Sequence, residues 1–184
     1  KGHSYQMAIK NKTIQNQNCP NCTKQSSDPE IRILSELRWI FKEVKSRHRV
    51  NGKEVDVFLP TFNIGIEFDG SYWHKDKEDS DLEKNKHLES RNIQLIRIRQ
   101  APLKPLSIND IIVSNKQLLK ADIDRLLMKI NLIPNNSNSN KIDKYLDNLS
   151  FVNEELFREY KSYFPSPLPE HSLVKLHPLV SAEW

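Results

Sequence analysis

The segment I-G-I-E-F-D-G, residues 64–70, constrains the fold of this chain more than any other. Apolar residues alternate with others along it and a glycine ends it, which is typical of a β-strand with one face in the core. Side chains two positions apart on a strand share a face, so Glu67 and Asp69 are expected to point together, away from the apolar residues. Acids are poor strand formers, and the pair therefore needs a reason.

Hydrophobic periodicity predicts the elements around this strand. Ser27, Pro29 and Glu30 form a helix-start pattern ahead of an amphipathic helix of about four turns. Asn51-Gly52 separates two strand-like runs, which predicts a hairpin. Strands are also expected at Val55–Leu59 and Ile93–Arg99. Between them, a helix is expected to start at a Ser80 cap, with Glu83 at the capping-box position, and to run to about Arg91. Helical structure is expected over 108–130, near 142–149 and near 153–160.

The order of these elements, helix, three strands, helix and strand, predicts an α/β core of roughly 80 residues. A strand, a helix and a second strand in succession indicate a parallel crossover.

A third acid lies on the preceding strand. Asp56 is expected to point away from Val55 and Val57, and if the two strands are neighbours its carboxylate converges with those of Glu67 and Asp69. Their mutual repulsion would be relieved by a divalent cation, and oxygen-only ligands favour Mg²⁺ over Zn²⁺. The alternative is that these acids line a solvated strand face.

Other polar residues border the acidic strand. His74 follows Asp69 within five residues, and an imidazole with a pKa near its ordinary value of about 6.5 is suited to proton transfer beside a metal; a surface role is the alternative. Asp81 lies in the first turn of the next helix, where the helix dipole alone explains it. Lys84 shares its face, and that face is expected to turn toward the sheet. Glu36 flanks the apolar stripe of the first helix, an ordinary boundary position.

Composition narrows the class of partner. The net charge of +4 and pI of about 9.0 fit an anionic partner such as nucleic acid. No apolar run approaches the length of a membrane span, so no membrane partner is expected. Cys19 and Cys22, spaced C-P-N-C, favour metal binding over a disulfide and thus a reducing, intracellular setting (cytoplasm, nucleoid or nucleus).

Three motifs occur in order: V-D-V-F-L-P, then I-E-F-D-G-S-Y-W-H, then D-L-E-K ahead of L-E-S-R-N-I-Q-L-I-R-I-R. Together, the run from about Asp28 to Arg99 resembles the PD-(D/E)XK nuclease superfamily. It is most similar to the very-short-patch mismatch-repair endonuclease and the related EDxHD homing endonucleases. The resemblance implies a restriction-endonuclease-like α-β-β-β-α-β core with a central mixed sheet.

The resemblance also implies roles, carried over by position. Glu36 matches the first acid of the EDxHD signature, Asp56 the principal metal-binding aspartate, His74 the histidine and Asp81 the closing aspartate. Mg²⁺ (or Mn²⁺) would then lie around Asp56, with His74 and Asp81 handling the protons of water or the leaving group.

The broader superfamily adds a second acid and a lysine at the positions of Glu67 and Asp69. The lysine position is an aspartate here, so the resemblance requires His74 or Lys84 to take the general-base role. Glu67 and Asp69 are expected to share the metal with Asp56.

Tyr72 and Trp73 fall where the mismatch-repair enzyme places aromatics that enter the base stack. Packing of Trp73 over the sheet edge is the alternative that we favour slightly. Basic residues that could follow a DNA backbone are Lys42, Lys45, Arg47, Arg49, Arg97 and Arg99.

The two ends resemble a different family. K-G-H-S-Y-Q-M-A-I-K-N-K-T, followed by C-P-N-C, is similar to the second half of a treble-clef zinc-ribbon repeat, which implies Zn²⁺ on His3, Cys19 and Cys22. S-L-V-K-L-H-P-L-V-S-A-E-W is similar to the opening of another repeat. The expected divisions are a partial zinc-ribbon (1–27), the endonuclease core (28–106), its helical extension (107–133), a linker with short helices forming a helical tail (134–165) and a further repeat (166–184).

These features predict a Mg²⁺-dependent endonuclease that hydrolyses phosphodiester bonds of double-stranded DNA, by nicking or by cutting both strands. Two alternatives stay open. One is a DNA-binding module whose nuclease core is degenerate and inactive; the other is a nuclease that acts on RNA or on a repair intermediate.

Overall fold

A computed structural model describes residues 26–74, 76–114, 117–132 and 138–163, all within the compact unit Ser26–Tyr163. His3, Cys19, Cys22 and the segment 166–184 lie outside the described residues, so the two expected zinc-ribbon segments stay predictions. The elements are α2 (Asp28–Ile40), β1 (Lys45–Val50), β2 (Lys53–Leu59), the 3-10 helix η1 (Pro60–Phe62), β3 (Ile64–Asp69), α3 (Ser71–His74), α4 (Glu78–Glu89), β4 (Gln94–Gln100), β5 (Ile111–Val113), α5 (Lys120–Asn131), α6 (Ser139–Leu146) and α7 (Glu154–Tyr163).

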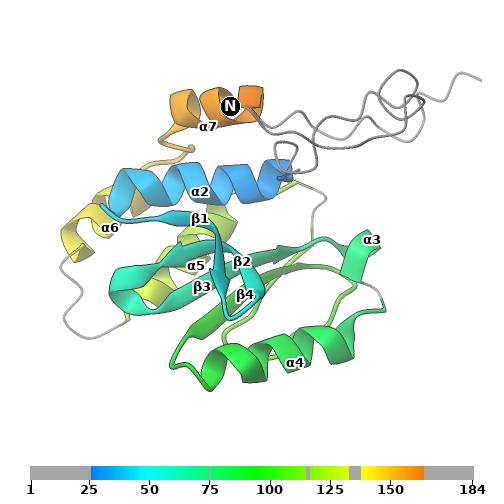
Figure 1. The fold of residues 1–184 in the computed structure, drawn as a ribbon. Coiled ribbons are helices and arrows are strands. Elements are labelled where there is room, and N and C mark those ends of the chain that lie inside the picture. The colour runs from blue at the N-terminus through cyan, green and yellow to red at the C-terminus, as the bar shows by residue number, and fades with distance from the viewer. Residues whose placement is uncertain (1–25, 75, 115–116, 133–137, 164–184) are drawn as a thin grey trace, which may run out of the picture. The chain divides into compact units, whose positions relative to one another are not determined.

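One five-stranded mixed sheet organises these elements, in the order β1-β2-β3-β4-β5. β1, β2 and β3 pair antiparallel, and β4 joins β3 in parallel after the crossover through α4. The predicted α/β class is confirmed. Figure 1 shows α2 over one side of the sheet and α4 over the other, with α7 lying on α2.

Local sequence signals start α2 and turn the hairpin as predicted. The Ser27 side chain caps α2 by accepting from the Glu30 backbone N–H at 3.4 Å, and its hydroxyl donates to the Glu30 carboxylate at 2.8 Å. Asn51 and Gly52 take positive φ angles of 45° and 85°, as a tight two-residue hairpin turn requires.

Two apolar cores lie on the two faces of the sheet. The larger joins strand residues such as Ile66 and Ile98 to α2, α5 and α6; the smaller consists of Val55, Phe58, Leu88, Ile93 and Leu95. Gly65 makes the smaller core tight, because a Cβ at that position would lie 2.9 Å from a methyl of Val55. The sheet and α4 are therefore held close together along the acidic strand β3.

The alternation of β2 breaks at Asp56. Val57 belongs to the larger core, whereas Val55 packs with Phe58 in the smaller one. Opposite Asp56 in the register, Arg47 has a φ of 48°, and the Asp56 carboxylate accepts from the backbone N–H of Phe68. The prediction that Val55 and Val57 share a face is wrong, because the two side chains pack in different cores.

Two predicted boundaries are also wrong. Residues 111–113 form β5 beside β4, and the helix within 108–130 begins only at Lys120. The run Ile111-Ile112-Val113 is β-branched throughout, which favours a strand. Ser80 does not cap α4, which begins at Glu78 because three acids in its first turn complement the helix dipole.

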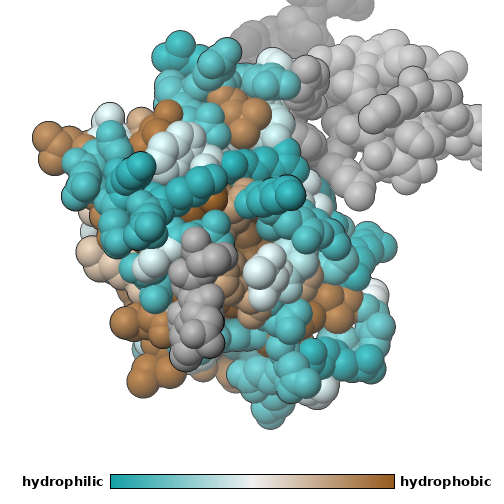
Figure 2. Space-filling view, turned by 90° about the vertical axis from the view of Figure 1, so that its left-hand side faces the viewer, coloured by the Kyte–Doolittle hydropathy of each residue, from teal (hydrophilic) through white to brown (hydrophobic). Residues whose placement is uncertain are grey.

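Residues 139–163 share in the packing of the fold. Ser139 and Asn140 fall inside α6, α7 packs along α2, and Ile142 and Tyr145 are fully buried in the larger core. The face of the molecule that carries α6 is mostly hydrophilic, with hydrophobic residues in separate groups (Figure 2). Within the described part of the chain, no helix combines the length and apolar character needed to cross a membrane.

Candidate functional site

The acidic strand β3 turns its two carboxylates toward α4, as its alternation predicted. Glu67 and Asp69 are 4% and 1% exposed, and the parallel register sets them beside Arg97 and Arg99 of β4. Ile64 and Ile66 lie in the larger core on the opposite face. Buried carboxylates persist only with partners, so this strand carries a polar centre inside the fold.

Arg97 is the centre of that network. Its Nη1 lies 2.7 Å from a Glu67 oxygen and 2.9 Å from an Asp69 oxygen, and its Nε donates to the Asn85 side chain at 3.0 Å. Burial by itself lowers the pKa of Arg97, but Glu67, Asp69 and Asp81 more than offset it, so the pKa is raised. Arg97 is therefore a permanent internal cation.

A second group forms where β3 ends. Nδ1 of His74 lies 3.0 Å from Oδ2 of Asp81 and 3.6 Å from Oδ1 of Asp69. The ligand atoms of these three residues all lie within 4.8 Å of one another, so the group could hold a metal ion. However, Arg97 binds both Asp69 oxygens, and Arg99 lies 3.5 Å from Asp69 and 3.6 Å from Asp81. Two arginines thus already balance its two carboxylates.

The carboxylates of Asp56 and Glu67 are less well balanced. Burial raises the pKa of Asp56 to about 7, with Glu30 adding to the rise and the Phe68 N–H and Lys84 opposing it. Burial likewise raises the pKa of Glu67 to about 7, against the charges of Arg97 and Lys84 and with that of Asp56. It is therefore unfavourable for both of these acids, on neighbouring strands, to be ionised at once. Another cation would stabilise the doubly charged form.

Glu30 is the site residue that the sequence did not reveal. Burial raises its pKa, and the charge of Glu67 adds to the rise. Because its capping-box position explains Glu30 locally, the pattern gave no further signal. The acid of α2 that acts on Asp56 is Glu30, whereas Glu36 had been expected from the resemblance.

The carboxylate of Glu36 is used elsewhere. It is fully buried and accepts from the Tyr145 hydroxyl at 2.9 Å and from the Val152 N–H at 2.9 Å, and it pairs with Arg32 at 3.2 Å. Glu36 lies six residues after Glu30, which turns its side chain about 120° further round the helix and about 9 Å along it. We correct the expected α2 acid of the site from Glu36 to Glu30.

Lys84 reaches the site from α4, on the face predicted to turn inward. Its Nζ contacts Oε1 of Glu67, and its charge lowers the pKa values of both Glu67 and Asp56. The face also carries Asp81, Asn85 and Leu88, all buried. An α4 lysine therefore stands beside the acids, while the strand position expected to hold a lysine is Asp69.

The aromatic pair is exposed next to His74. Tyr72 and Trp73 are 70% and 68% exposed, and their rings meet edge to face at 4.9 Å. The Ser71 N–H and hydroxyl both donate to the Gln100 side chain at 3.1 Å, which ties α3 to the end of β4. The alternative that Trp73 packs over the sheet edge is wrong.

The predicted basic contacts differ in their surroundings. Arg97 and Arg99 are buried at 0% and 2% exposure inside the ion-pair network, so their expected role on a DNA backbone is wrong. Arg47 and Arg49 both pair with Glu54, at 2.6 and 3.2 Å, on the β1–β2 hairpin. Arg49 keeps 68% of its side chain exposed and is the arginine of this set best placed to meet another molecule.

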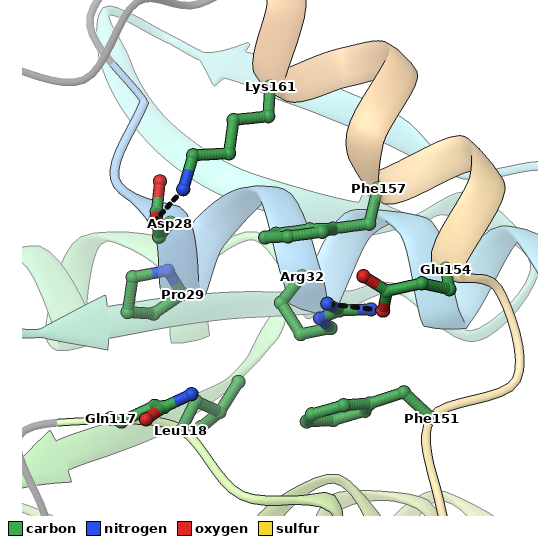
Figure 3. A pocket seen from close by; sticks show the side chains of 9 residues that line it. All are labelled: Asp28, Pro29, Arg32, Gln117, Leu118, Phe151, Glu154, Phe157 and Lys161. Carbon is green, nitrogen blue, oxygen red and sulfur yellow. Dashed lines mark hydrogen bonds and ion pairs between the residues drawn. The ribbon is translucent and has the colours of Figure 1, made fainter.

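A cavity of about 480 Å³ lies away from these acids, between α2 and α7 (Figure 3). Its lining residues are Asp28, Pro29, Arg32, Gln117, Leu118, Phe151, Glu154, Phe157 and Lys161. Arg32 lies between the rings of Phe151 and Phe157 and pairs with Glu154, while Lys161 pairs with Asp28. These charges compensate one another, so the unbalanced acids at the sheet remain the candidate site.

No protein family, no curated protein and no solved structure matches this chain.

Proposed function

We propose that the chain is a divalent-metal-dependent endodeoxyribonuclease whose Mg²⁺ or Mn²⁺ is held by Asp56 and Glu67, with Glu30 beside them. The observation that carries the proposal is that the Asp56 carboxylate of β2 accepts from the Phe68 N–H of β3, one residue from Glu67. Burial raises the pKa of both acids to about 7, which agrees with this placement. Ionising two buried carboxylates side by side is unfavourable, and such pairs are common at functional sites. Carboxylate oxygens are the ligands that Mg²⁺ prefers.

The donor set fits a hard cation. Asp56, Glu67 and Glu30 offer oxygen ligands, and burial raises the pKa of all three. For Glu67 the rise persists although Arg97 and Lys84 oppose it. The group of Asp69, His74 and Asp81 is the alternative site, but each of its two carboxylates lies beside an arginine. In the first set Glu67 also has cationic partners, whereas the Asp56 carboxylate accepts from a backbone N–H. We therefore assign the ion to the first set.

A bound divalent ion would polarise a phosphate oxygen and lower the pKa of the attacking water. The chain itself supplies the proton carrier. Asp81 engages Nδ1 of His74 at 3.0 Å, which orients the ring and leaves Nε2 to exchange a proton with the water or the leaving oxygen. Asp81 is thus a positioning residue for His74.

Double-stranded DNA is the substrate that the surroundings favour. Tyr72 and Trp73 present two exposed aromatic faces one residue from the proton carrier, and such side chains enter or stack on base steps. The net charge of +4 favours a polyanion. The succession of α2, β1, β2, β3, α4 and β4 follows the α-β-β-β-α-β order that the resemblance implies, which supports the proposal. Zinc-ribbon segments at the ends would lengthen the DNA footprint.

The test is cleavage of supercoiled plasmid by the purified chain with Mg²⁺ or Mn²⁺, and with EDTA as the metal-free reaction. Asp56→Asn keeps an oxygen for the Phe68 N–H but removes the charge, so we expect it to bind DNA normally and to lose at least about 10²-fold in cleavage rate. Glu43→Gln, at an exposed acid, is the matched control. If the wild-type chain binds DNA but leaves it intact with both metals, it is a non-catalytic binding module.

A further inference from the structure

Both oxygens of Glu67 are already bound by cations of the chain. Nζ of Lys84 contacts Oε1, and Nη1 of Arg97 lies 2.7 Å from Oε2. Glu67 is 4% exposed, so little water reaches its carboxylate. A divalent ion that uses Glu67 as a ligand must therefore compete with a resident cation for this buried carboxylate.

The two resident cations differ in their freedom to leave. Arg97 is fully buried, binds both oxygens of Asp69 and donates to Asn85. Lys84 stands on the surface of α4 with 21% of its side chain exposed, and a four-carbon stem carries its ammonium. Moving Lys84 needs a change of rotamer, whereas moving Arg97 would break the buried network.

We infer that Lys84 is a displaceable counter-ion that occupies Oε1 of Glu67 until a divalent ion binds, and that its ammonium then turns to the phosphodiester. The inference rests on the proposed function, because it takes Glu67 as a metal ligand. The ammonium group of Lys84 thus acts in two places, one before and one after the divalent ion binds. In the first it stabilises the buried acid, and in the second it faces the negative charge that builds up on the phosphate in the transition state.

This arrangement predicts opposite effects of one substitution. Lys84→Met keeps the length of the stem but removes the competing charge, so metal binding should become tighter. Cleavage should become slower, because the ammonium is missing from the transition state. A lysine that merely stabilised α4 would leave metal binding unchanged, and a lysine that helped to assemble the site would strengthen it.

Mn²⁺ titration by calorimetry at pH 8 measures the first effect, on the whole chain without DNA. We expect Lys84→Met to bind Mn²⁺ about tenfold more tightly than wild type, since a charge-assisted hydrogen bond no longer competes. Lys86→Met removes an equal charge from an exposed position on the same helix and should match wild type. Lys84→Gln, which keeps a polar end group, gives the same comparison if the methionine variant does not fold by circular dichroism.

Single-turnover plasmid cleavage at saturating Mn²⁺ measures the second effect, and Lys84→Met is expected to be at least about tenfold slower than Lys86→Met. Equal or weaker Mn²⁺ binding by both Lys84 variants overturns the inference while leaving the metal site intact. Wild-type protein that binds no Mn²⁺, with Asp56→Asn indistinguishable from it, overturns the proposed function and the inference with it.

Discussion

Glu36 and Glu30 are two acids of one helix that should respond to substitution in opposite ways. The carboxylate of Glu36 ties α2 to α6, where it accepts from Tyr145, and to the segment between α6 and α7, where it accepts from Val152. Glu30 instead faces the acids of the sheet. The resemblance gave the site role to Glu36, so a pair of conservative substitutions separates the two assignments.

The magnitude for Glu36→Gln follows from its hydrogen bonds. Oε2 accepts from the Tyr145 hydroxyl and the Val152 N–H, and Oε1 pairs with Arg32 at 3.2 Å. A glutamine keeps the shape, but its NH₂ must face either the Val152 N–H or the Arg32 guanidinium. One buried donor then loses its acceptor and Arg32 keeps only Glu154 of its two charged partners, which together cost about 2–4 kcal/mol of unfolding free energy. For a chain of this length that lowers Tm by about 10 °C.

Calorimetric melting and Mn²⁺ titration on the same samples test the pair. Glu36→Gln should melt about 10 °C lower and bind Mn²⁺ as wild type does. Glu30→Gln removes a charge that Asp56 opposes, so its unfolding free energy should stay within about 1 kcal/mol of wild type while its Mn²⁺ affinity falls. Glu43→Gln, at an exposed acid, should change neither quantity.

The reasoning would be refuted by the reverse pattern. If Glu36→Gln melts with wild type and loses Mn²⁺ affinity, the buried carboxylate is not a structural tie and belongs to the site. If Glu30→Gln binds Mn²⁺ normally, the α2 acid next to Asp56 has no part in holding the ion.

The remaining predictions concern pH and the exposed aromatic pair. The pKa values of Asp56 and Glu67 are raised to about 7 in the folded state, so the folded chain binds more protons than the unfolded chain between about pH 4 and pH 7, and stability without metal should fall as pH rises from 5 to 8. The unfolding free energy, measured by chemical denaturation in EDTA, should fall by roughly 3 kcal/mol over this range; the figure is reduced because Asp56 is partly exposed to solvent. The double variant Asp56→Asn, Glu67→Gln should not show this loss. A metal-free stability that rises over this range, or a double variant that falls as steeply, contradicts the assignment. Trp73→Ala should leave Tm unchanged, because the ring is 68% exposed, but weaken binding of a duplex by about tenfold or more in fluorescence anisotropy. Leu149→Ala, at a fully exposed side chain, is its control, and equal affinities would remove Trp73 from the DNA interface.

Local sequence signals predicted the structure correctly where a particular residue type satisfies a particular requirement of the backbone. Ser27 caps α2 because a hydroxyl before a helix satisfies a free N–H, and Asn51-Gly52 turns the hairpin because both residues accept positive φ. The alternation of 64–70 gave the strand and the shared face of Glu67 and Asp69 for the same kind of reason.

What the sequence did not predict depends on which segments meet in space. Arg97 and Arg99 were predicted to be surface charges. Nothing near them in the chain shows that the parallel pairing of β4 with β3 places them beside Glu67 and Asp69. Glu30 had a sufficient local explanation as a capping residue. β5 is three residues long and too short for a period to separate strand from helix.

The kind of cation at each carboxylate explains how one sheet end can hold both a rigid frame and a reactive centre. Arg97 and Arg99 are always charged and buried, and they lie beside Asp69 and Asp81, the two acids that face Nδ1 of His74. Asp56 and Glu67 have a partly exposed lysine instead of a second arginine, and burial raises the pKa of both acids despite it. Were Lys84 an arginine with the same anchoring as Arg97, the acids would be satisfied permanently and no ion could enter. In the proposed function, the place of this lysine on α4 therefore decides which of the acids are open to a metal ion.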